Sequence, residues 1–480
     1  MEPIVQTLVI VLYLVTLGML ALYGIHRSAL LFLYLRHRHE RTAPRSRFDE
    51  ADLPAVTIQL PMFNEMFVAE RLIDAMASVD YPRDRLEIQV LDDSTDATSA
   101  IARARCAALR ERGLDVAYVH REERTGYKAG ALAAGMRRAK GDFLLIFDAD
   151  FVPGPGIVRD LIDFFADPSV GVAQARWSHL NRDASLLTRC EAMLLDGHFV
   201  IEHAARNRSG RFFNFNGTAG MWRKAAIAAA GGWQHDTITE DMDLSYRAQL
   251  AGWKFVYAPH VSAPAELPCD MNSFKGQQYR WAKGSVQTAR KLLGAILRAP
   301  VSRKVKTEAF FHLTNNLAYV LLLVLAALQL PNMLIRRQLE HPELLMLDVP
   351  LFLATCGSVA AFYVVAHRDL YGGSWPAIKH LPAMLAIGVG LAVNNGRAAI
   401  EGLFGGGVEF VRTAKSGAVD GKTSSRSANY RVRWPWHNAV ELVFAAYCVA
   451  TLVVAILTRN WASIPFVLLF SAGFAYVGAT

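Results

Sequence analysis

Acidic residues follow short apolar runs in the first half of this chain. Asp92 and Asp93 come directly after one run, and Asp148 and Asp150 end another at residues 143–147. In a parallel sheet the carboxyl ends of the strands meet at one edge, where such sheets bind ligands. Alternate side chains share a face, so Asp148 and Asp150 can reach one cation. Two solvated carboxylates would explain this spacing in isolation, but beside further acidic clusters it predicts a site for Mg²⁺ or Mn²⁺ bound together with substrate phosphates.

A third acidic cluster, residues 239–243, opens a predicted helix. Glu240 or Asp241 could simply favour the positive end of that helix. Transfer of a group to a hydroxyl oxygen, however, needs a carboxylate that accepts the hydroxyl proton as the new bond forms. Asp241 is the candidate for this base.

A fourth element, Gln-Gln-Tyr-Arg-Trp at residues 277–281, stands shortly before the most apolar part of the chain. Arg280 carries a planar guanidinium that can bind a departing diphosphate. Trp281 offers a flat apolar face on which a sugar ring can pack. Arg and Trp beside a membrane also anchor proteins at its interface, and that explanation would be favoured for this pair alone.

Together and in this order, the four elements resemble the processive family 2 glycosyltransferases of the cellulose synthase superfamily, with their D, D, D, QxxRW pattern. Further motifs are most like those of the cellulose synthase-like β-mannan and β-glucan synthases. These motifs are PMFNE at 61–65, GYKAG at 126–130, QARW at 174–177 and FNGTAG at 215–220. The resemblance covers residues 56–283 closely and the remaining apolar region more loosely.

The resemblance implies an α/β catalytic domain of the GT-A type, which is Rossmann-like, and a role for each motif residue. The nucleoside would be bound by Glu65 with Asp92 or Asp93, the diphosphate by Lys128, and the metal ion by Asp148 and Asp150. Other residues would contact substrate beside the base Asp241, namely Glu240, Phe215, Asn216, Gly217 and Thr218. Gln277, Arg280 and Trp281 would line the acceptor entrance.

Residues 410–415, Phe-Val-Arg-Thr-Ala-Lys, are similar to the FxVTxK gating loop of cellulose synthases, although Arg412 replaces a valine of that pattern. A basic loop carrying Thr413 and Lys415 could close over the diphosphate and exclude water. Contact with lipid headgroups is the alternative explanation for its charge.

Composition places part of the chain in a membrane. Of the 480 residues, 52% are hydrophobic, and the basic residues that give the net charge of +8 stand beside apolar runs rather than in a patch typical of nucleic-acid binding. The five cysteines show no CxxC spacing.

Five apolar runs come near the roughly 20 residues that a membrane crossing needs. They lie at residues 5–25, 317–334, 344–366, 439–457 and 463–477.

A sixth apolar run, residues 381–393, is shorter and is expected to form an interfacial or re-entrant helix. Arginines crowd the segment that follows the first span, which places the next domain in the cytoplasm by the positive-inside rule. The expected regions are an N-terminal transmembrane helix with a basic linker (1–50), the GT-A domain (51–300), a transmembrane helix pair (301–370), an interfacial helix with the gating-like loop (371–437) and a second transmembrane pair (438–480).

The sequence therefore predicts an integral membrane protein, located in the plasma membrane if its source is bacterial, with a cytoplasmic catalytic domain. The expected reaction is an inverting, processive transfer of hexose from UDP-glucose or GDP-mannose to a β-glucan or β-mannan. A non-processive glycolipid synthase of the ceramide glucosyltransferase type is the nearest alternative. An inactive scaffold or sugar sensor agrees poorly with the retained acidic residues. Donor sugar, linkage and accessory subunits are not readable from the sequence.

Overall fold

The computed structural model describes residues 3–339, 345–405, 415, 417 and 436–480. One half of this part of the chain is built on a seven-stranded sheet with the order β3-β2-β1-β4-β6-β5-β7. The strands are β1 (Val56–Met62), β2 (Leu86–Asp92), β3 (Val116–His120), β4 (Phe143–Ile146), β5 (Val170–His179), β6 (Gly220–Arg223) and β7 (Lys254–Ala265). This arrangement confirms the predicted α/β fold.

Helices cover both faces of the sheet, which is why a strand such as β2 is buried along its whole length. One face packs against helices α2 (Ala69–Ala77), α3 (Thr98–Glu111) and α5 (Ile157–Ile162). The other face packs against α4 (Tyr127–Arg138), α8 (Lys224–Ala229) and α9 (Glu240–Leu250). The core on this second face continues into apolar helices beyond the sheet, through residues such as Leu30 and Phe362. The two halves of the molecule thus share a hydrophobic core.

Strand directions decide which loops meet at one edge of the sheet. Strands β1, β2 and β4 run parallel, with Met62 level with Asp92 and Gln59 level with Ile146. Strand β6 runs antiparallel to both β4 and β5. The loop that enters β6 therefore lies at the same edge as the loops that leave β1, β2 and β4.

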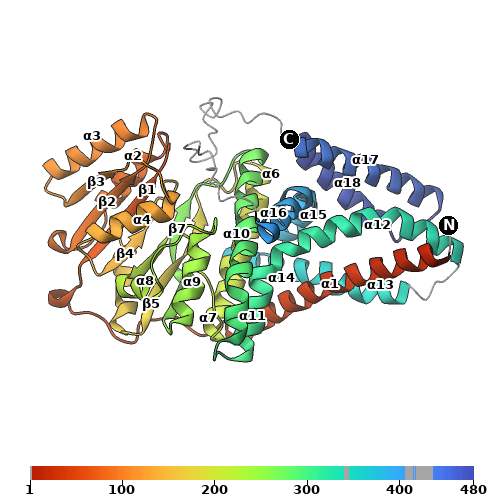
Figure 1. The fold of residues 1–480 in the computed structure, drawn as a ribbon, viewed down its shortest axis with the longest axis horizontal. Coiled ribbons are helices and arrows are strands. Elements are labelled where there is room, and N and C mark those ends of the chain that lie inside the picture. Colours follow the sequence, from red (N-terminus) through yellow and green to blue (C-terminus); the bar gives the residue numbers. More distant parts are fainter. Residues whose placement is uncertain (1–2, 340–344, 406–414, 416, 418–435) are drawn as a thin grey trace.

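A middle layer of helices stands between the sheet and the apolar half (Figure 1). It contains α6 (Leu186–Gly197), a π-helical turn (His198–His203), α7 (Ala204–Arg208), α10 (Met271–Arg298) and α11 (Arg303–Thr314). Helix α6 starts with a capping box, in which Ser185 and Thr188 satisfy each other's backbone N–H groups. Helix α10 is capped by Asp270, whose side chain accepts a hydrogen bond from the backbone of Ser273. Both helix starts are thus fixed close to the sheet.

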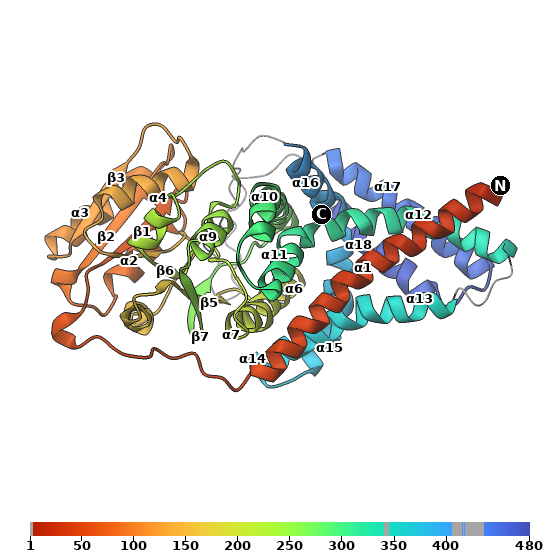
Figure 2. The same ribbon diagram turned by 60° about the horizontal axis from the view of Figure 1, so that its bottom comes forward.

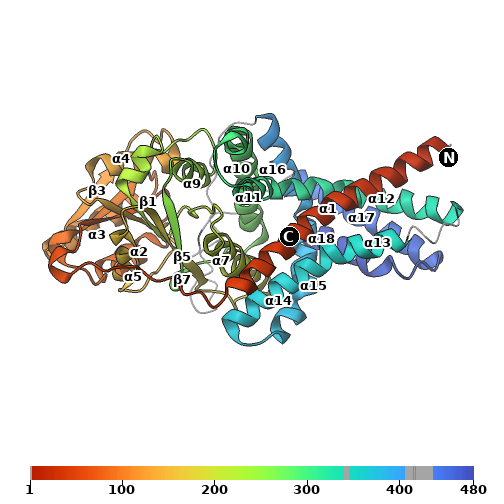
Figure 3. The same ribbon diagram turned by 90° about the horizontal axis from the view of Figure 1, so that it is seen from below.

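Within the described residues, four helical segments are long and apolar enough to cross a membrane. They span Pro3–His37, Arg303–Gln338, Asp348–Tyr371 and Trp436–Leu457. They contain α1 (Pro3–His37), α12 (Ala318–Leu339), α14 (Ser358–Tyr371) and α17 (Trp436–Leu457), while α13 (Leu345–Phe352) leads into α14. Figures 2 and 3 show α1 running obliquely through this half toward the middle layer.

The fifth predicted span, residues 463–477, corresponds to α18 (Ile464–Ala479), which is shorter than the other four. Its 16 residues reach only about 24 Å, against a hydrocarbon core of roughly 30 Å. Helix α18 packs along α17 (Figure 1). Four of the five predicted spans thus correspond to helices long and apolar enough to cross a membrane, and a crossing by α18 stays a prediction.

The apolar run 381–393 does not form a helix of its own. It lies across the junction between α15 (Trp375–Gly390) and α16 (Ala392–Phe404), which together are bent by 44°. Helix α16 packs on α10, and α15 packs on α18 and α6. A bent pair of this kind is either a broken span or a re-entrant segment, so the re-entrant prediction stays a prediction.

Candidate functional site

A cavity of about 190 Å³ opens at the carboxyl edge of the sheet, where the loops after β1, β2 and β4 meet the loop before β6. We call it the sheet-edge cavity. Most of the residues singled out from the sequence line it. They are Glu65, Asp93, Lys128, Asp148, Asp150, Asn216, Gly217, Glu240, Asp241, Gln277, Arg280, Trp281 and Lys415. Carboxylates from distant parts of the chain therefore share one cavity, as the strand argument predicts.

Helix α10 brings the Gln-Arg-Trp element to this cavity. Gln277, Arg280 and Trp281 are spaced three and four residues apart, so they lie on one face of the helix. Burial lowers the pKa of Arg280 to about 10, while the charges of Asp148 and Glu240 act in the opposite direction. The guanidinium therefore stays charged at neutral pH and is available to an anionic group in the cavity.

Each of the two aspartates after β4 forms an ion pair with a lysine. Asp148 Oδ1 lies 2.5 Å from Lys128 Nζ, and Asp150 Oδ2 lies 2.5 Å from Lys415 Nζ. Burial alone would lower the pKa of Lys128, but the carboxylates around it raise the pKa overall, so this lysine is a cation. The loop after β4 thus carries two compact carboxylate–ammonium pairs.

The donor set of this loop suits a hard divalent cation that shares its coordination with a ligand. Among the described residues, no group of three or more His, Cys, Asp and Glu side chains could hold a metal ion without further ligands. Asp148 and Asp150 supply carboxylate oxygens to the same cavity. Mg²⁺ and Mn²⁺ accept such oxygens together with phosphate and water, so these two residues fit the ion when a phosphorylated substrate completes the site.

Glu240, which is buried, and Asp241, which is half-buried, form a pair of neighbouring carboxyl groups at the start of α9. Burial raises the pKa of Asp241, and the nearby Lys128 charge partly opposes that shift. Burial and the charge of Asp241 likewise raise the pKa of Glu240. Asp241 Oδ1 accepts a hydrogen bond of 2.8 Å from the backbone N–H of Met242, which fixes its orientation. A carboxylate with a raised pKa is a stronger base than an exposed aspartate.

Gly217 lies beside Asp241, where a larger residue would be crowded. A Cβ at this position would lie 3.1 Å from Asp241 Oδ2, and the backbone φ of +79° disfavours other residues. Its carbonyl accepts a hydrogen bond of 3.0 Å from Lys128 Nζ. The buried side chain of Gln174 holds the same loop, accepting from Asn216 N and donating to the carbonyl of Thr218. These hydrogen bonds therefore fix the conformation of the loop at residues 216–218 beside Asp241.

Three residues predicted to bind substrate lie behind the wall of the cavity. Asp92 is fully buried, and its carboxylate accepts hydrogen bonds from Ser99 and Tyr118. Phe215 and Thr218 are also fully buried, and Thr218 Oγ1 accepts a hydrogen bond from the backbone N–H of Asp148. These side chains shape the loops that carry other residues to the cavity.

Of the two candidates for binding the nucleoside, Asp92 and Asp93, the positions of the side chains therefore favour Asp93. Asp93 lines the cavity and is held by Arg121, whose Nε lies 2.7 Å from Asp93 Oδ1. Thr413 falls outside the described residues, as does all of the gating-like loop except Lys415. Lys415 is described, and its pairing with Asp150 brings this part of the chain to the sheet-edge cavity.

Several cavity residues were given no role from the sequence, among them Arg124 and Trp177. Arg124 lies over the ring of Phe63, 3.4 Å from its centroid, and both residues line the cavity. Trp177 also lines it, with its ring packed edge-on against Phe151. Trp177 belongs to the QARW motif, so that motif could have indicated it. Arg124 stands just before the GYKAG motif but matches no part of it.

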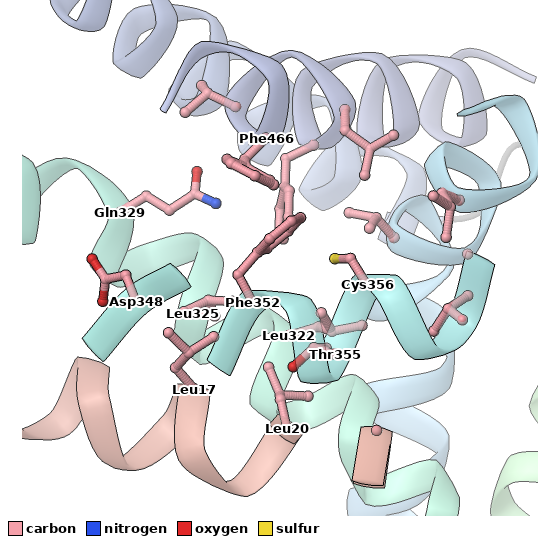
Figure 4. A pocket seen from close by; sticks show the side chains of 18 of the residues that line it. Leu17, Leu20, Leu322, Leu325, Gln329, Asp348, Phe352, Thr355, Cys356 and Phe466 are labelled. Carbon is pink, nitrogen blue, oxygen red and sulfur yellow. The ribbon is translucent and has the colours of Figure 1, made fainter. Parts of the chain in front are cut away.

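A larger cavity of about 550 Å³ lies among the apolar helices (Figure 4). We call it the helix cavity. Its wall combines apolar side chains such as Leu17 and Leu325 with polar ones, among them Gln329 and Asp348. Arg27 and Asn315 line it as well, and so does Leu194 of α6. Helix α6 therefore borders the helix cavity and leads directly into the π-helical turn beside the sheet.

Comparison with known proteins identifies relatives of the chain. Residues 54–284 match the model of the family described as "Glycosyltransferase like family 2". Glucomannan 4-beta-mannosyltransferase 2 of Arabidopsis thaliana is 34% identical over 430 residues, which cover 86% of this chain and 78% of that protein. Glucomannan 4-beta-mannosyltransferase 1 of Oryza sativa subsp. japonica is 36% identical over 410 residues, which cover 82% of this chain and 76% of that protein.

Among solved structures, the mannosyltransferase PcManGT from Pyrobaculum calidifontis, in complex with GDP-Man and Mn²⁺, is similar in fold. The two structures align with a TM-score of 0.52 at 23% sequence identity, over 74% of this chain and 99% of that one. This similarity supports the fold described above.

Proposed function

Because this chain belongs to glycosyltransferase family 2, together with the plant glucomannan 4-beta-mannosyltransferases, we propose that it polymerises mannose from GDP-mannose into a β-linked polysaccharide. The observation that carries this proposal is the shared cavity of a base, Asp241, and a set of cations, Lys128, Arg280 and Lys415. Such a site matches the needs of transfer from a nucleoside diphosphate sugar to a hydroxyl group. Both relatives named above are mannosyltransferases, and the structural neighbour was solved with GDP-Man.

In the proposed reaction, the acceptor hydroxyl attacks the anomeric carbon of the donor sugar. The bond from that carbon to the diphosphate oxygen breaks as the new glycosidic bond forms, and the configuration inverts. Asp241 accepts the proton of the hydroxyl group, because its carboxylate lines the cavity, is oriented by Met242 N and has a raised pKa. The electron pair leaves with the diphosphate, whose negative charge Arg280 and Lys128 stabilise.

Asp148 and Asp150 would hold the divalent ion, Mg²⁺ or Mn²⁺, beside the diphosphate. Bound there, the ion would supply Lewis-acid stabilisation of the leaving group. Lys128 and Lys415, which pair with these carboxylates, would then be close enough to contact the phosphate oxygens. Lys415 also carries the end of the gating-like loop to the cavity, which supports the proposal that this loop closes over the donor.

Repeated addition requires that the product leave the site while it grows. The helix cavity lies beyond α6, on the apolar side of the middle layer, and its wall mixes aromatic and polar residues such as Phe352 and Gln329 (Figure 4). Aromatic faces and amide groups suit a sugar chain. We therefore propose that the polymer passes through this half of the molecule. The comparisons do not favour UDP-glucose as donor or glycolipid synthesis.

The helices that are long and apolar enough to span a bilayer make this an integral membrane protein. The two relatives named above are plant proteins, which is at odds with the bacterial source considered from the sequence. The basic linker after α1 still favours a catalytic domain on the cytoplasmic side.

Donor specificity tests the proposal directly. Purified protein in lipid nanodiscs is offered radiolabelled GDP-mannose, GDP-glucose, UDP-glucose or UDP-N-acetylglucosamine in separate reactions with Mn²⁺, and polymer-bound label is counted. We expect incorporation from GDP-mannose and a product that an endo-β-mannanase degrades. Incorporation only from UDP-glucose, with a product resistant to that enzyme, would overturn the assignment of mannose while leaving the family unchanged.

A further inference from the structure

A chain of hydrogen bonds holds the side-chain amide of Asn216, through histidines that are not among the residues lining the sheet-edge cavity. His203 Nε2 lies 2.5 Å from Asn216 Oδ1, and Asn216 Nδ2 lies 3.0 Å from His198 Nε2. His198 Nδ1 lies 2.9 Å from the carboxylate of Glu202. The amide oxygen and nitrogen of Asn216 are therefore each bonded to a histidine of the π-helical turn, and one of these histidines is bonded in turn to Glu202.

Glu202 sets the direction of every bond in this chain. Burial alone would raise the pKa of Glu202, but the charge of Arg206, 3.2 Å away, and the bond from His198 bring it well below its usual value. The ionised carboxylate can only accept, so His198 must carry its proton on Nδ1. With that proton on Nδ1, His198 Nε2 is left to accept from Asn216 Nδ2, 3.0 Å away. This places Asn216 Oδ1 toward His203.

His203 completes the chain as a donor through Nε2–H. Burial, followed by the positive charges of its surroundings, holds the pKa of His203 well below its usual value, so this ring is neutral. Its Nδ1 has no hydrogen-bond partner among the described residues, as expected for a bare nitrogen surrounded by the rings of Phe199, Phe213 and Tyr257. One tautomer of each histidine therefore satisfies all three bonds.

The π-helical turn is what lets both histidines reach the same amide. His198 and His203 are five residues apart, and in an α-helix with 3.6 residues per turn such positions point roughly 140° apart. The wider π-helical turn, with its i to i+5 bonding, brings them to nearly the same side. Their ring centroids lie 4.3 Å apart. Such π-helical turns inside α-helices occur frequently at functional sites.

We propose that His198 and His203 are positioning residues that aim the amide of Asn216 at a hydroxyl group of the acceptor sugar. The inference rests on the function proposed above. Asn216 lines the sheet-edge cavity next to Gly217, where a Cβ would lie only 3.1 Å from Oδ2 of the proposed base Asp241. After its two bonds to the histidines, the amide keeps one N–H and one lone pair. A hydroxyl group held there stands beside the carboxylate that accepts its proton.

Paired substitutions of His203 test this inference. In His203→Leu the bond to Asn216 Oδ1 is lost, whereas in His203→Gln the side-chain amide can donate from about the position of the ring Nε2. With GDP-mannose saturating and a β-linked manno-oligosaccharide varied, we expect His203→Leu to raise the acceptor KM about threefold to tenfold, the effect of one lost hydrogen bond. His203→Gln should recover most of this loss. The donor KM and the hydrolysis of GDP-mannose by water should stay as in the wild type.

His312 provides the matched control, because it is a buried histidine of α11 whose Nδ1 lies 2.8 Å from the hydroxyl of Tyr246, away from Asn216. His312→Leu should lower the yield of folded protein and leave the acceptor KM unchanged. If His203→Leu does not fold, Asn216→Asp, which keeps the side-chain shape and removes the N–H donors, should raise the acceptor KM instead.

A wild-type acceptor KM in either His203→Leu or Asn216→Asp would overturn the inference, as would an equal rise in His312→Leu or no recovery in His203→Gln. These results would leave the proposed function intact. If the wild-type protein itself transfers no mannose to any oligosaccharide, the proposed function fails and the inference fails with it.

Discussion

Replacing Asp241 by asparagine removes the proposed base while keeping its shape. The asparagine Oδ1 can still accept the hydrogen bond from Met242 N, and the rest of the cavity wall is unaltered. What is lost is the ability to take the acceptor proton. General base catalysis contributes about 10² to 10⁴-fold, so the barrier should rise by about 2.7 to 5.4 kcal/mol and kcat should fall by the same 10² to 10⁴-fold. Donor affinity should change by less than about threefold, because one exposed or half-buried charge contributes little to binding.

The assay is the transfer of radiolabelled mannose at saturating donor, with donor affinity measured separately by equilibrium binding. Asp243→Asn is the matched control, since Asp243 lies on the same helix but pairs with Arg247 and Lys291 behind the cavity. This variant should lose stability and keep its turnover per folded molecule. Wild-type turnover in Asp241→Asn, or an equal loss of turnover in Asp243→Asn, would refute the role of Asp241 as base.

Three further predictions concern the same cavity. Burial raises the pKa of Asp241, so on acidification its carboxylate is protonated before the pH falls to about 3.9, the usual aspartate pKa. The fall of kcat on the acidic side should therefore occur above pH 4. A fall at or below that pH would be inconsistent with Asp241 as the base. Gly217→Ala places a Cβ 3.1 Å from Asp241 Oδ2 at a φ of +79°. If this strain displaces the loop beside Asp241, kcat should fall about fivefold to thirtyfold, since left-handed backbone costs about 1 to 2 kcal/mol; undiminished turnover would contradict the packing argument. Chelation of divalent ions should abolish transfer without unfolding the protein, because Lys128 and Lys415 pair with Asp148 and Asp150 and balance their charge. Mn²⁺ or Mg²⁺ should restore transfer, and turnover that persists in chelator would exclude the metal role.

The convergence of the first two acidic clusters was predictable from strand direction. Asp93 and Asp148 reach one cavity since their loops leave the same sheet edge, whereas the start of α9 brings Asp241 there. The choice between Asp92 and Asp93 was not predictable. Neighbouring residues at a strand end point to opposite sides, and only the packing of Tyr118 against Asp92 shows which carboxylate is turned inward.

The apolar half shows where composition stops being informative. Residues 5–25 were predicted as the first span, but α1 continues to His37 because Arg27 is accommodated over the rings of Phe362 and Tyr363. A hydropathy window ends an apolar run at a charged residue such as Arg27. The aromatic rings that contact this arginine in the folded protein nevertheless allow the helix to continue. The π-helical turn was equally hidden, since residues five apart, such as His198 and His203, match no regular helical or strand period.

Repeated addition of mannose to one β-linked chain, as proposed above, would show itself in the size of the product. Purified protein in nanodiscs is supplied with radiolabelled GDP-mannose in large excess, and the length of the labelled product is measured over time. We expect long chains even at the earliest times, insoluble in organic solvent and shortened by an endo-β-mannanase. A short, lipid-extractable product carrying a single sugar would contradict repeated addition.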